Sequence, residues 1–479
     1  MTTEKTDSTV NPVESDSLRG EVLEDDGEVF KNNAEHANFR ALGLWVSPDF
    51  RVASHALIAD ERIPTIIVLI KLCFATGVLS IPAALGVVGY GPGVVLLALW
   101  SALTMYYAFV MYQFRMKYKG IHNIVDAAAL MGGPIAREAT GALFLLTWTQ
   151  VLPYHLCTGS GFVGLSQGLK ILANGKGCNI VWTLIAAIAT GILSSIRTLG
   201  KLAILTWIGF ASIFTAVFIV VVGVTTIDRP AAAPKEGPFD LGVIAVGHPG
   251  FVAGLVAALN LFSGFGSTST FMPVMAEMKV PRTFPKALFI SQGLLVACYI
   301  SFGLVVYVYC GIYVASPSLA SAGGTLEKVA FGISIPGFIM TSTLWTHVAA
   351  KFLFVRILRG SDHLQSNSVK HWVSWLSSTI SLTIVSFLLA EAIPFFSLIL
   401  GLIGSLCCSP TCLVIPGCMG LYMQRGNYKS SRKIMALCTL HCVTIVGGSF
   451  MAIAGTYTTI QSIVDAYASD SVAKAFSCS

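Results

Sequence analysis

The chain has 479 residues, of which 54% are hydrophobic and only 11% are charged, against about 25% charged in an average soluble protein. Thirteen of its 24 Asp and Glu residues lie in the first 61 positions, so the remainder is more apolar still. This composition excludes a soluble enzyme, a nucleic-acid-binding protein and a secreted disulfide scaffold. It predicts an all-α integral membrane protein.

Residues 1–50 are rich in Glu, Asp, Ser, Thr and Asn and contain few aromatic residues. Such a segment cannot bury enough apolar surface to fold by itself, and it lacks the basic start and apolar core of a cleaved secretory signal. We therefore expect a disordered, acidic, cytosolic tail at 1–50, a membrane domain at 51–457 and a short non-cytosolic tail at 458–479.

About eleven apolar segments are long enough to cross a bilayer, which takes roughly 20 residues of helix. They lie near 64–87, 91–113, 138–170, 178–196, 200–227, 250–275, 288–313, 335–358, 372–392, 394–422 and 434–457. With the N-terminus in the cytosol, seventeen Lys and Arg residues fall in inner loops and six on the outer side. Because cytosolic loops carry an excess of Lys and Arg, this distribution supports a cytosolic N-terminus.

Two of the predicted helices are interrupted in mid-membrane. The first contains Gly77 and Pro82, and the sixth contains Gly264 and Gly266 beside polar side chains. Backbone freed at such a break must be satisfied by protein or by a water-lined cavity. Since the breaks are five helices apart, and five is odd, helices 1 to 5 and 6 to 10 can form an inverted repeat. Interrupted helices at matching positions of two halves point to the central site of a transporter, although glycine-rich packing faces remain an alternative.

The segment from Phe74 to Pro82 resembles the G-T-G-x-L-x-x-P first-helix motif of the amino acid/auxin permease family. Residues Phe262–Phe284 are similar to that family's sixth helix and its following E-M-x-x-P-x-x-F loop. The resemblance extends over nearly all of the chain after residue 50 and is closest to fungal neutral amino-acid permeases. Ala75 departs from it, standing where the family usually has glycine. The resemblance implies a five-plus-five inverted repeat of the leucine-transporter type with an eleventh helix outside.

The predicted substrate site lies between the two breaks. The half-helix that starts near Val78 presents free N–H groups and a positive dipole end to a carboxylate, and unwound carbonyls of helix 6 accept from an ammonium group. Neither break contains Asp, Glu or Arg, which favours neutral amino acids because an unpaired buried charge is costly. The candidate substrate-binding residues are Thr76, Gly77, Val78, Leu79, Asn260, Phe262, Ser263, Gly264 and Phe265.

Coupling to an ion requires a titratable group or oxygen ligands. Lys71 lies roughly 10 Å into the membrane at about 1.5 Å per residue, where a lysine is either functional or snorkels. His155 and His347 lie in predicted core helices, and histidine suits proton exchange near neutral pH, although packing roles are an alternative. Thr343 and Thr346 offer hydroxyl groups to sodium, or bond to their own helix backbone.

These features together predict a symporter that imports neutral aliphatic and aromatic amino acids, with protons favoured over sodium as the coupling ion. We expect a multi-pass protein of the plasma membrane, with the vacuolar membrane possible, in contact with lipid and not with nucleic acid. A vacuolar amino-acid transporter and a non-transporting amino-acid sensor are the alternatives. The His-x-x-x-Asp pattern at His122 and Asp126 has no second catalytic cluster, so we expect no enzyme activity, cofactor or bound metal.

Overall fold

The computed structural model describes residues 62–74, 76–118, 151–196, 199–278, 280–358, 368–393 and 395–469, together with isolated residues between 121 and 132 and at 361, 363 and 476. The predicted tail at 1–50 and the pattern at His122 and Asp126 lie outside them. All regular elements in the described residues are helices.

The first half of the described chain contains α4 (Arg62–Cys73), η1 (Thr76–Ser80), α5 (Ile81–Val88), α6 (Tyr90–Lys117), α8 (Val151–Leu172), α9 (Asn179–Ser194) and α10 (Leu199–Thr226). The second half contains α11 (Phe251–Ser263), η2 (Gly266–Thr270), α12 (Phe271–Glu277), η3 (Pro281–Thr283), α13 (Phe284–Cys310), η4 (Gly311–Tyr313), η5 (Ser318–Ala322), α14 (Gly324–Ile357), α15 (Val369–Ala392), α16 (Phe396–Ile403), the π-helical η7 (Gly404–Cys408) and η8 (Pro410–Val414), α17 (Ile415–Met423) and α18 (Arg432–Ala468).

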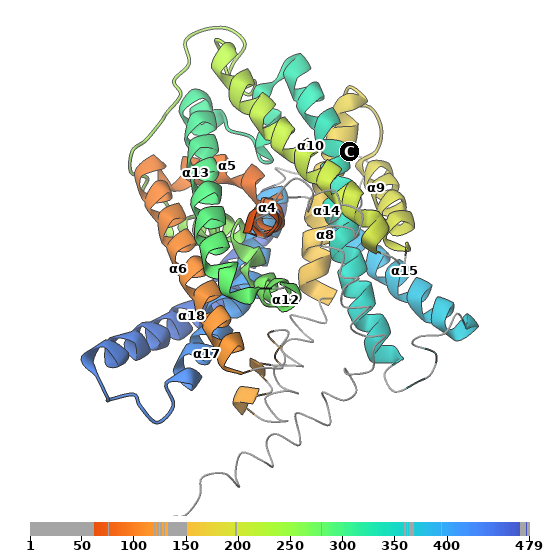
Figure 1. Cartoon of the computed structure of the whole chain (residues 1–479). Coiled ribbons are helices and arrows are strands. Elements are labelled where there is room, and N and C mark those ends of the chain that lie inside the picture. The colour runs from red at the N-terminus through yellow and green to blue at the C-terminus, as the bar shows by residue number, and fades with distance from the viewer. Residues whose placement is uncertain are drawn as a thin grey trace, which may run out of the picture.

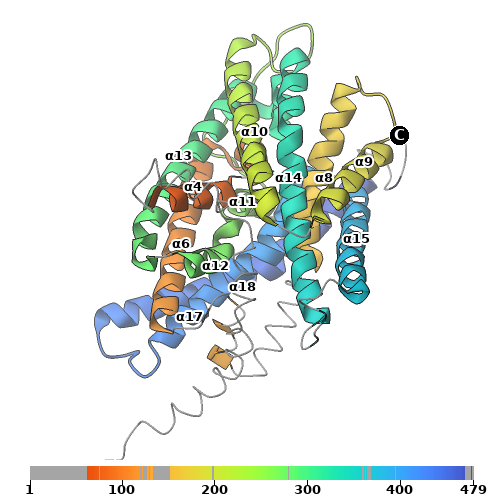
Figure 2. The same ribbon diagram turned by 45° about the vertical axis from the view of Figure 1, so that its right-hand side comes forward.

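The helices form two groups, and the interrupted segments α4, α5 and α11 belong to the second. Helices α8, α9, α14 and α15 pack on one another, and α10 packs along α14. On the other side, α13 packs against α4, α5 and α6, and α11 packs against α5 and α6. Figure 1 shows α4 close to the centre with these groups to its right and left, and Figure 2 shows α18 running across the lower part of the bundle.

The chain is an all-helical membrane protein. Among the described residues, seven helices are long and apolar enough to cross a bilayer, or eight if the bent pair of segments at 65–73 and 76–88 counts as one span. Each of the eleven predicted segments contains a helix, but α9 and α11 are shorter apolar helices. The last helix continues beyond its predicted end at 457, and α18 extends through a more polar stretch to Ala468.

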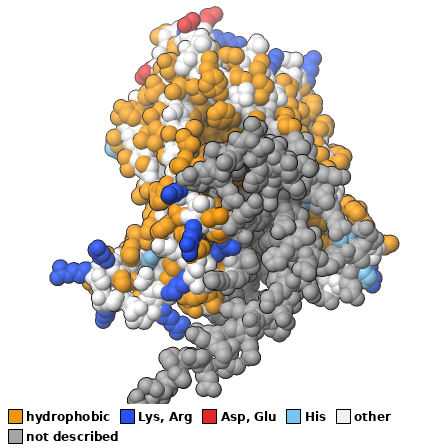
Figure 3. All heavy atoms as spheres, in the orientation of Figure 1, with side chains coloured by type: hydrophobic (Ala, Val, Ile, Leu, Met, Phe, Trp, Pro, Cys, Tyr) orange, Lys and Arg blue, Asp and Glu red, His pale blue; other side chains and the backbone are white. Residues whose placement is uncertain are grey.

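The surface has the pattern expected of a protein embedded in lipid. Figure 3 shows a broad band of hydrophobic side chains, with most Lys and Arg side chains at the lower end and the Asp and Glu side chains at the upper end. Many of the large exposed side chains are apolar and lie on helix faces, including Phe218, Ile380 and Ile453. Contact of such faces with water would be unfavourable, whereas contact with lipid tails is not.

Candidate functional site

The first helix is interrupted where the sequence predicts it. Helix α4 ends at Cys73, a 3-10 turn occupies Thr76–Ser80, and α5 begins at Ile81 with Pro82 in its first turn. Proline suits a first turn because its missing N–H would have no helical partner there. The two halves are bent by 45°. The new segment therefore starts at Thr76, slightly before the predicted Val78.

The sixth predicted helix is interrupted in the same way. Helix α11 ends at Ser263, and η2 begins at Gly266. The Ser263 hydroxyl donates to the carbonyl of Asn260 at 2.8 Å, and the Thr268 hydroxyl donates to the carbonyl of Phe265 at 2.8 Å. These bonds satisfy part of the backbone freed by the break.

The two interrupted helices run side by side in opposite directions. Helix α11 packs against η1 and α5, and α4 packs against η2, so the first half of each helix lies beside the second half of the other. The Ser267 hydroxyl of η2 also donates to the carbonyl of Leu72 in α4 at 2.6 Å. This antiparallel pairing is the arrangement expected of equivalent helices in an inverted repeat.

The breaks touch each other through two glycines. A Cβ atom placed on Gly77 would lie 3.0 Å from the Cα atom and 3.2 Å from the nitrogen of Gly264. A side chain at position 77 would therefore force the backbone of the second break to move. The close neighbour in the structure is the backbone of the second break, so the glycine sets the distance between the two interrupted helices.

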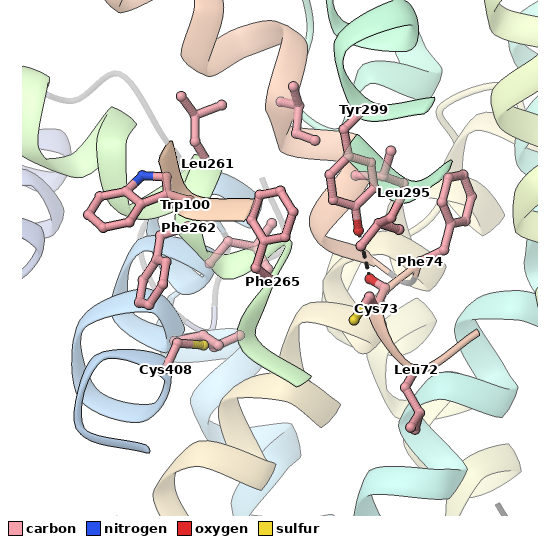
Figure 4. Packing of buried hydrophobic residues seen from close by; sticks show 14 of the residues in the cluster. Leu72, Cys73, Phe74, Trp100, Leu261, Phe262, Phe265, Leu295, Tyr299 and Cys408 are labelled. Atoms are coloured by element: carbon pink, nitrogen blue, oxygen red, sulfur yellow. Dashed lines mark hydrogen bonds between the residues drawn. The ribbon is translucent and has the colours of Figure 1, made fainter. Parts of the chain in front are cut away.

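Tyr299 of α13 connects both breaks, and it is not among the predicted site residues. Its hydroxyl lies 2.8 Å from the carbonyl oxygen of Cys73 and 3.0 Å from that of Gly264, and the residue is fully buried. Figure 4 shows the ring between Phe74 and Phe265, with the bond to Cys73 drawn. A tyrosine in an apolar helix gives no sequence signal of its partners, since these lie far away in the chain.

The candidate residues Phe262 and Phe265, and Phe74 beside the first break, contact different neighbours. Phe265 packs edge-on against Tyr299, with ring centroids 5.4 Å apart, and Phe262 packs on Trp100 of α6 at 4.8 Å. Phe74 also contacts Tyr299, at 6.0 Å, together with aromatic rings of α10. Phe74 and Phe265 therefore face a common aromatic cluster, whereas Phe262 lies on the other side of the second break (Figure 4).

Polar side chains surround the breaks. The side-chain oxygen of Asn260 is buried and has no hydrogen-bond partner in the described part of the protein. The hydroxyl of Thr76 lies 3.4 Å from that of Ser160 in α8. Val78 and Leu79 are completely buried.

The candidate coupling threonines lie on α14, and Thr346 faces α8. Thr346 and Thr158 place their hydroxyl oxygens 3.2 Å apart, and Ser342 donates to the Thr158 carbonyl at 3.2 Å. Thr343 is fully buried, and its hydroxyl has no partner among the described residues. These oxygens form a hydroxyl-rich contact between α8 and α14.

Lys71 is the buried cation nearest to the first break. It lies two residues before Cys73, is 8% exposed, and places its Nζ atom 4.9 Å from the centroid of the Trp207 ring of α10. A cation over an indole face is stabilised by the negative face of the ring. The amine therefore points to a neighbouring helix.

Of the two candidate histidines, the structure describes the side chain of His347, whose contacts are not with the breaks. His347 packs edge-on against Trp375 of α15, with centroids 5.0 Å apart, and its Nδ1 lies 3.1 Å from the Ser194 carbonyl oxygen of α9. This position is on the α9 and α15 side of α14. His155 belongs to α8, but its side chain lies outside the described part of the structure.

A π-helical segment packs against the second break. Elements η7 and η8 contact η2, and the Cys412 thiol donates to the Gly266 carbonyl at 3.2 Å. Cys407, Cys408 and Cys412 of this segment are buried. A Cβ atom on Gly266 would overlap the Cys408 sulfur, so the break depends on this close approach.

An all-helical membrane bundle with two apposed helix breaks at its centre defines the class of polytopic membrane transporters. Residues 63–461 match the family model described as transmembrane amino acid transporter protein. The chain belongs to this family of amino acid transporters. This result agrees with the family resemblance seen in the sequence and confirms that the chain is a transporter and not an enzyme.

Two fungal proteins are similar over most of their length. A transmembrane transporter of Fusarium pseudograminearum is 36% identical over 94% of this chain and 90% of its own. The N amino acid transport system protein of Neurospora crassa is 30% identical over 86% of this chain and 87% of its own.

A solved structure titled "Inward facing conformation of Mhp1" is a weaker match. It has a TM-score of 0.44 and 16% sequence identity, and the match covers 86% of this chain and 92% of that one.

Proposed function

We propose that the protein is a symporter that imports neutral aliphatic and aromatic amino acids together with protons across the plasma membrane. The observation that carries this proposal is the contact between the two helix breaks at Gly77 and Gly264. It brings the backbone groups that each helix no longer pairs internally to one place in the bundle. A zwitterion needs such groups of both polarities, because its carboxylate and its ammonium must both leave water.

Each break supplies one polarity. The chain N–H groups at Thr76–Ser80 begin the second half of the first broken helix and suit a carboxylate. The carbonyls at the end of α11, from Asn260 to Gly264, suit an ammonium group. The unpartnered side-chain oxygen of Asn260 adds a further acceptor.

The choice of neutral substrates follows from the charges near the breaks. Residues 70–82 and 258–270 contain no Asp, Glu or Arg, and Lys71 is directed to Trp207. A charged substrate side chain would thus be buried without a counter-ion, at a cost of several kcal/mol. Phe74 and Phe265 offer apolar contact instead. The name of the Neurospora relative, N amino acid transport system protein, supports an amino acid substrate.

Proton coupling is supported by Lys71. Among the described residues it is the buried amine closest to a break, and a buried lysine is a side chain that can take part in proton transfer. His347 remains a candidate, although its contacts lie with α9 and α15. Sodium is the second candidate, favoured by the hydroxyl pair of Thr158 and Thr346 and by the buried Thr343 hydroxyl, which has no partner among the described residues.

The test is uptake by purified protein in proteoliposomes. We expect an acidic exterior without sodium to drive accumulation of labelled leucine or phenylalanine, and a protonophore to abolish it. Unlabelled leucine, phenylalanine and tryptophan should compete at neutral pH, whereas arginine and aspartate should compete poorly. Uptake that requires sodium and ignores the proton gradient would contradict proton coupling, and equal competition by arginine would contradict the neutral site.

Two further measurements, made beside the uptake assay, separate the alternatives. A sensor would bind leucine, seen as a rise in its unfolding temperature, without net uptake into vesicles. A transporter of the vacuolar membrane would show uptake in vesicles, but a fluorescent fusion would locate it on the vacuole. Uptake together with location at the cell surface is the result expected here.

A further inference from the structure

The Tyr299 hydroxyl contacts backbone carbonyls of two other helices. Cys73 is the last residue of α4 and Gly264 directly follows α11, so their carbonyls belong to the backbone freed at the two breaks. Both oxygens lie within 3.0 Å of the same Tyr299 hydroxyl. One side chain from a third helix thereby holds the ends of both interrupted helices.

The hydroxyl cannot satisfy both carbonyls fully. A tyrosine carries a single O–H proton, so it donates one full hydrogen bond at a time. The carbonyl that does not receive it needs another donor, because a buried unsatisfied carbonyl costs about 1–3 kcal/mol. A group with several N–H donors that enters between the breaks satisfies this requirement.

The ring of Tyr299 is held in place on several sides. It lies against Phe265 at 5.4 Å and Phe74 at 6.0 Å between ring centroids. A Cβ atom on Gly264 would lie 3.0 Å from the Tyr299 ring. The hydroxyl position is thus fixed by packing, and the two carbonyls are fixed with it.

We propose that Tyr299 is a positioning residue for substrate recognition. It holds the carbonyl oxygens of Cys73 and Gly264 close together. One of these oxygens accepts the tyrosine proton, and the other is left to accept a hydrogen bond from the α-ammonium group of the substrate. This inference rests on the proposed amino acid site and adds a residue of α13 to it. Its specific consequence is that Tyr299 contributes to recognition of the ammonium group and not of the substrate side chain or carboxylate.

The experiment compares two ligands that differ in the ammonium group. Leucine carries it, and 4-methylpentanoate has the same carbon skeleton and carboxylate without it. Affinities are measured in detergent from the rise in unfolding temperature over a series of ligand concentrations. In Tyr299→Phe we expect leucine affinity to fall at least tenfold, and 4-methylpentanoate affinity to stay within about twofold of wild type.

Tyr307→Phe is the matched control. Tyr307 lies on the same helix, is fully buried, and its hydroxyl accepts a hydrogen bond from the Ile244 backbone at 3.1 Å. The variant removes the hydroxyl of another buried tyrosine of α13, eight residues along the helix from Tyr299, whose hydrogen-bonding partner Ile244 is not at a break. It should therefore keep the wild-type ratio of leucine to 4-methylpentanoate affinity.

Tyr299→His is the second variant, for use if Tyr299→Phe does not give a monodisperse protein. Its ring N–H can still donate, and it should retain part of the preference for leucine. An unchanged affinity ratio in both Tyr299 variants, or equal losses for both ligands, would overturn this inference while leaving the amino acid site intact. Wild-type protein that binds neither leucine nor any other neutral amino acid would overturn the proposed function as well.

Discussion

At position 77 the space that a side chain would occupy is filled by the backbone of a different helix. A backbone atom cannot rotate away as the end of a side chain does, so the neighbouring helix must move as a whole. Overpacking of this kind costs about 1–3 kcal/mol or more. It also separates the two breaks whose distance defines the proposed site.

We predict that Gly77→Val abolishes leucine uptake and that Gly77→Ala lowers it at least tenfold. Gly86→Ala is the control on α5, because its added Cβ atom would lie 3.6 Å from the Tyr307 ring, an ordinary contact. Surface expression is measured in parallel to separate a lost site from a lost protein. Normal uptake by correctly inserted Gly77→Val would remove the glycine contact from the mechanism.

The Lys71 amine over Trp207 leads to a second prediction at this scale. Lys71→Met keeps a long side chain and removes the charge, so uptake should continue without acceleration by an acidic exterior. Lys117→Met is the control, since Lys117 is exposed and donates to the Met423 carbonyl. The pH dependence of initial leucine uptake in sodium-free proteoliposomes gives the readout. A Lys71→Met protein with the wild-type pH profile would move the coupling role to another residue.

Which residues of the site are predictable from sequence depends on how local their signal is. Gly77 and Gly264 stand out because glycine in mid-membrane leaves a mark in an apolar segment. Tyr299 leaves none, because aromatic residues are common in such helices and its acceptors are 226 and 35 positions away. For His347 the sequence identifies the helix but not the face of the helix that carries the side chain, which packs on Trp375 and lies beside the Ser194 carbonyl.

At the scale of whole elements, helix α18 and the π-helical segment show how packing depends on which face carries a glycine. Gly448 faces the bundle, where an added Cβ atom would lie 2.9 Å from Val414 and 3.2 Å from Leu413. Its carbonyl also accepts from the Ser409 hydroxyl at 2.7 Å. The adjacent Gly447 has open space around it.

We therefore predict opposite effects for these adjacent glycines. Gly447→Ala should stabilise α18 by roughly 1 kcal/mol, the difference in helix propensity between the two residues. Gly448→Ala should destabilise the protein by about 1–3 kcal/mol through overpacking against η8. Unfolding temperatures in detergent report both changes. Equal shifts for the two variants would contradict the packing of α18 on the π-helical segment.

The positions of the helices can be predicted largely from the apolar segments of the sequence. The interruptions of regular helical geometry described below cannot. Each of the eleven predicted spans contains a helix, and seven or eight of the described helices are long and apolar enough to cross a bilayer. The π-helical stretch from Gly404 to Val414 is not foreseen, because its register is set by contact with α18 and η2 and not by local residues. The extension of α18 beyond 457 is missed because hydropathy marks the membrane and not the end of a helix.

For the whole molecule, the distribution of charge predicts its direction in the membrane. Loops at 173–178 and 424–431 join helices on opposite predicted sides. Epitope tags placed after Gly175 and Gly426 suit this test, since both glycines have positive φ and no atom near their Cβ positions. In intact cells an antibody should reach the tag at 175 and should reach the tag at 426 only after permeabilisation. The opposite pattern would reverse the predicted orientation.

The contact between Gly77 and Gly264 also has a consequence for the evolution of this protein. Where a glycine is confined by a side chain, as Gly266 is by Cys408, a larger residue at one position can be offset by a smaller one at the other. Gly77 has no such exchange, because its neighbour has no side chain to reduce. Homologues that keep this geometry should therefore vary in pairs at positions 266 and 408, while position 77 admits glycine alone whatever their substrate.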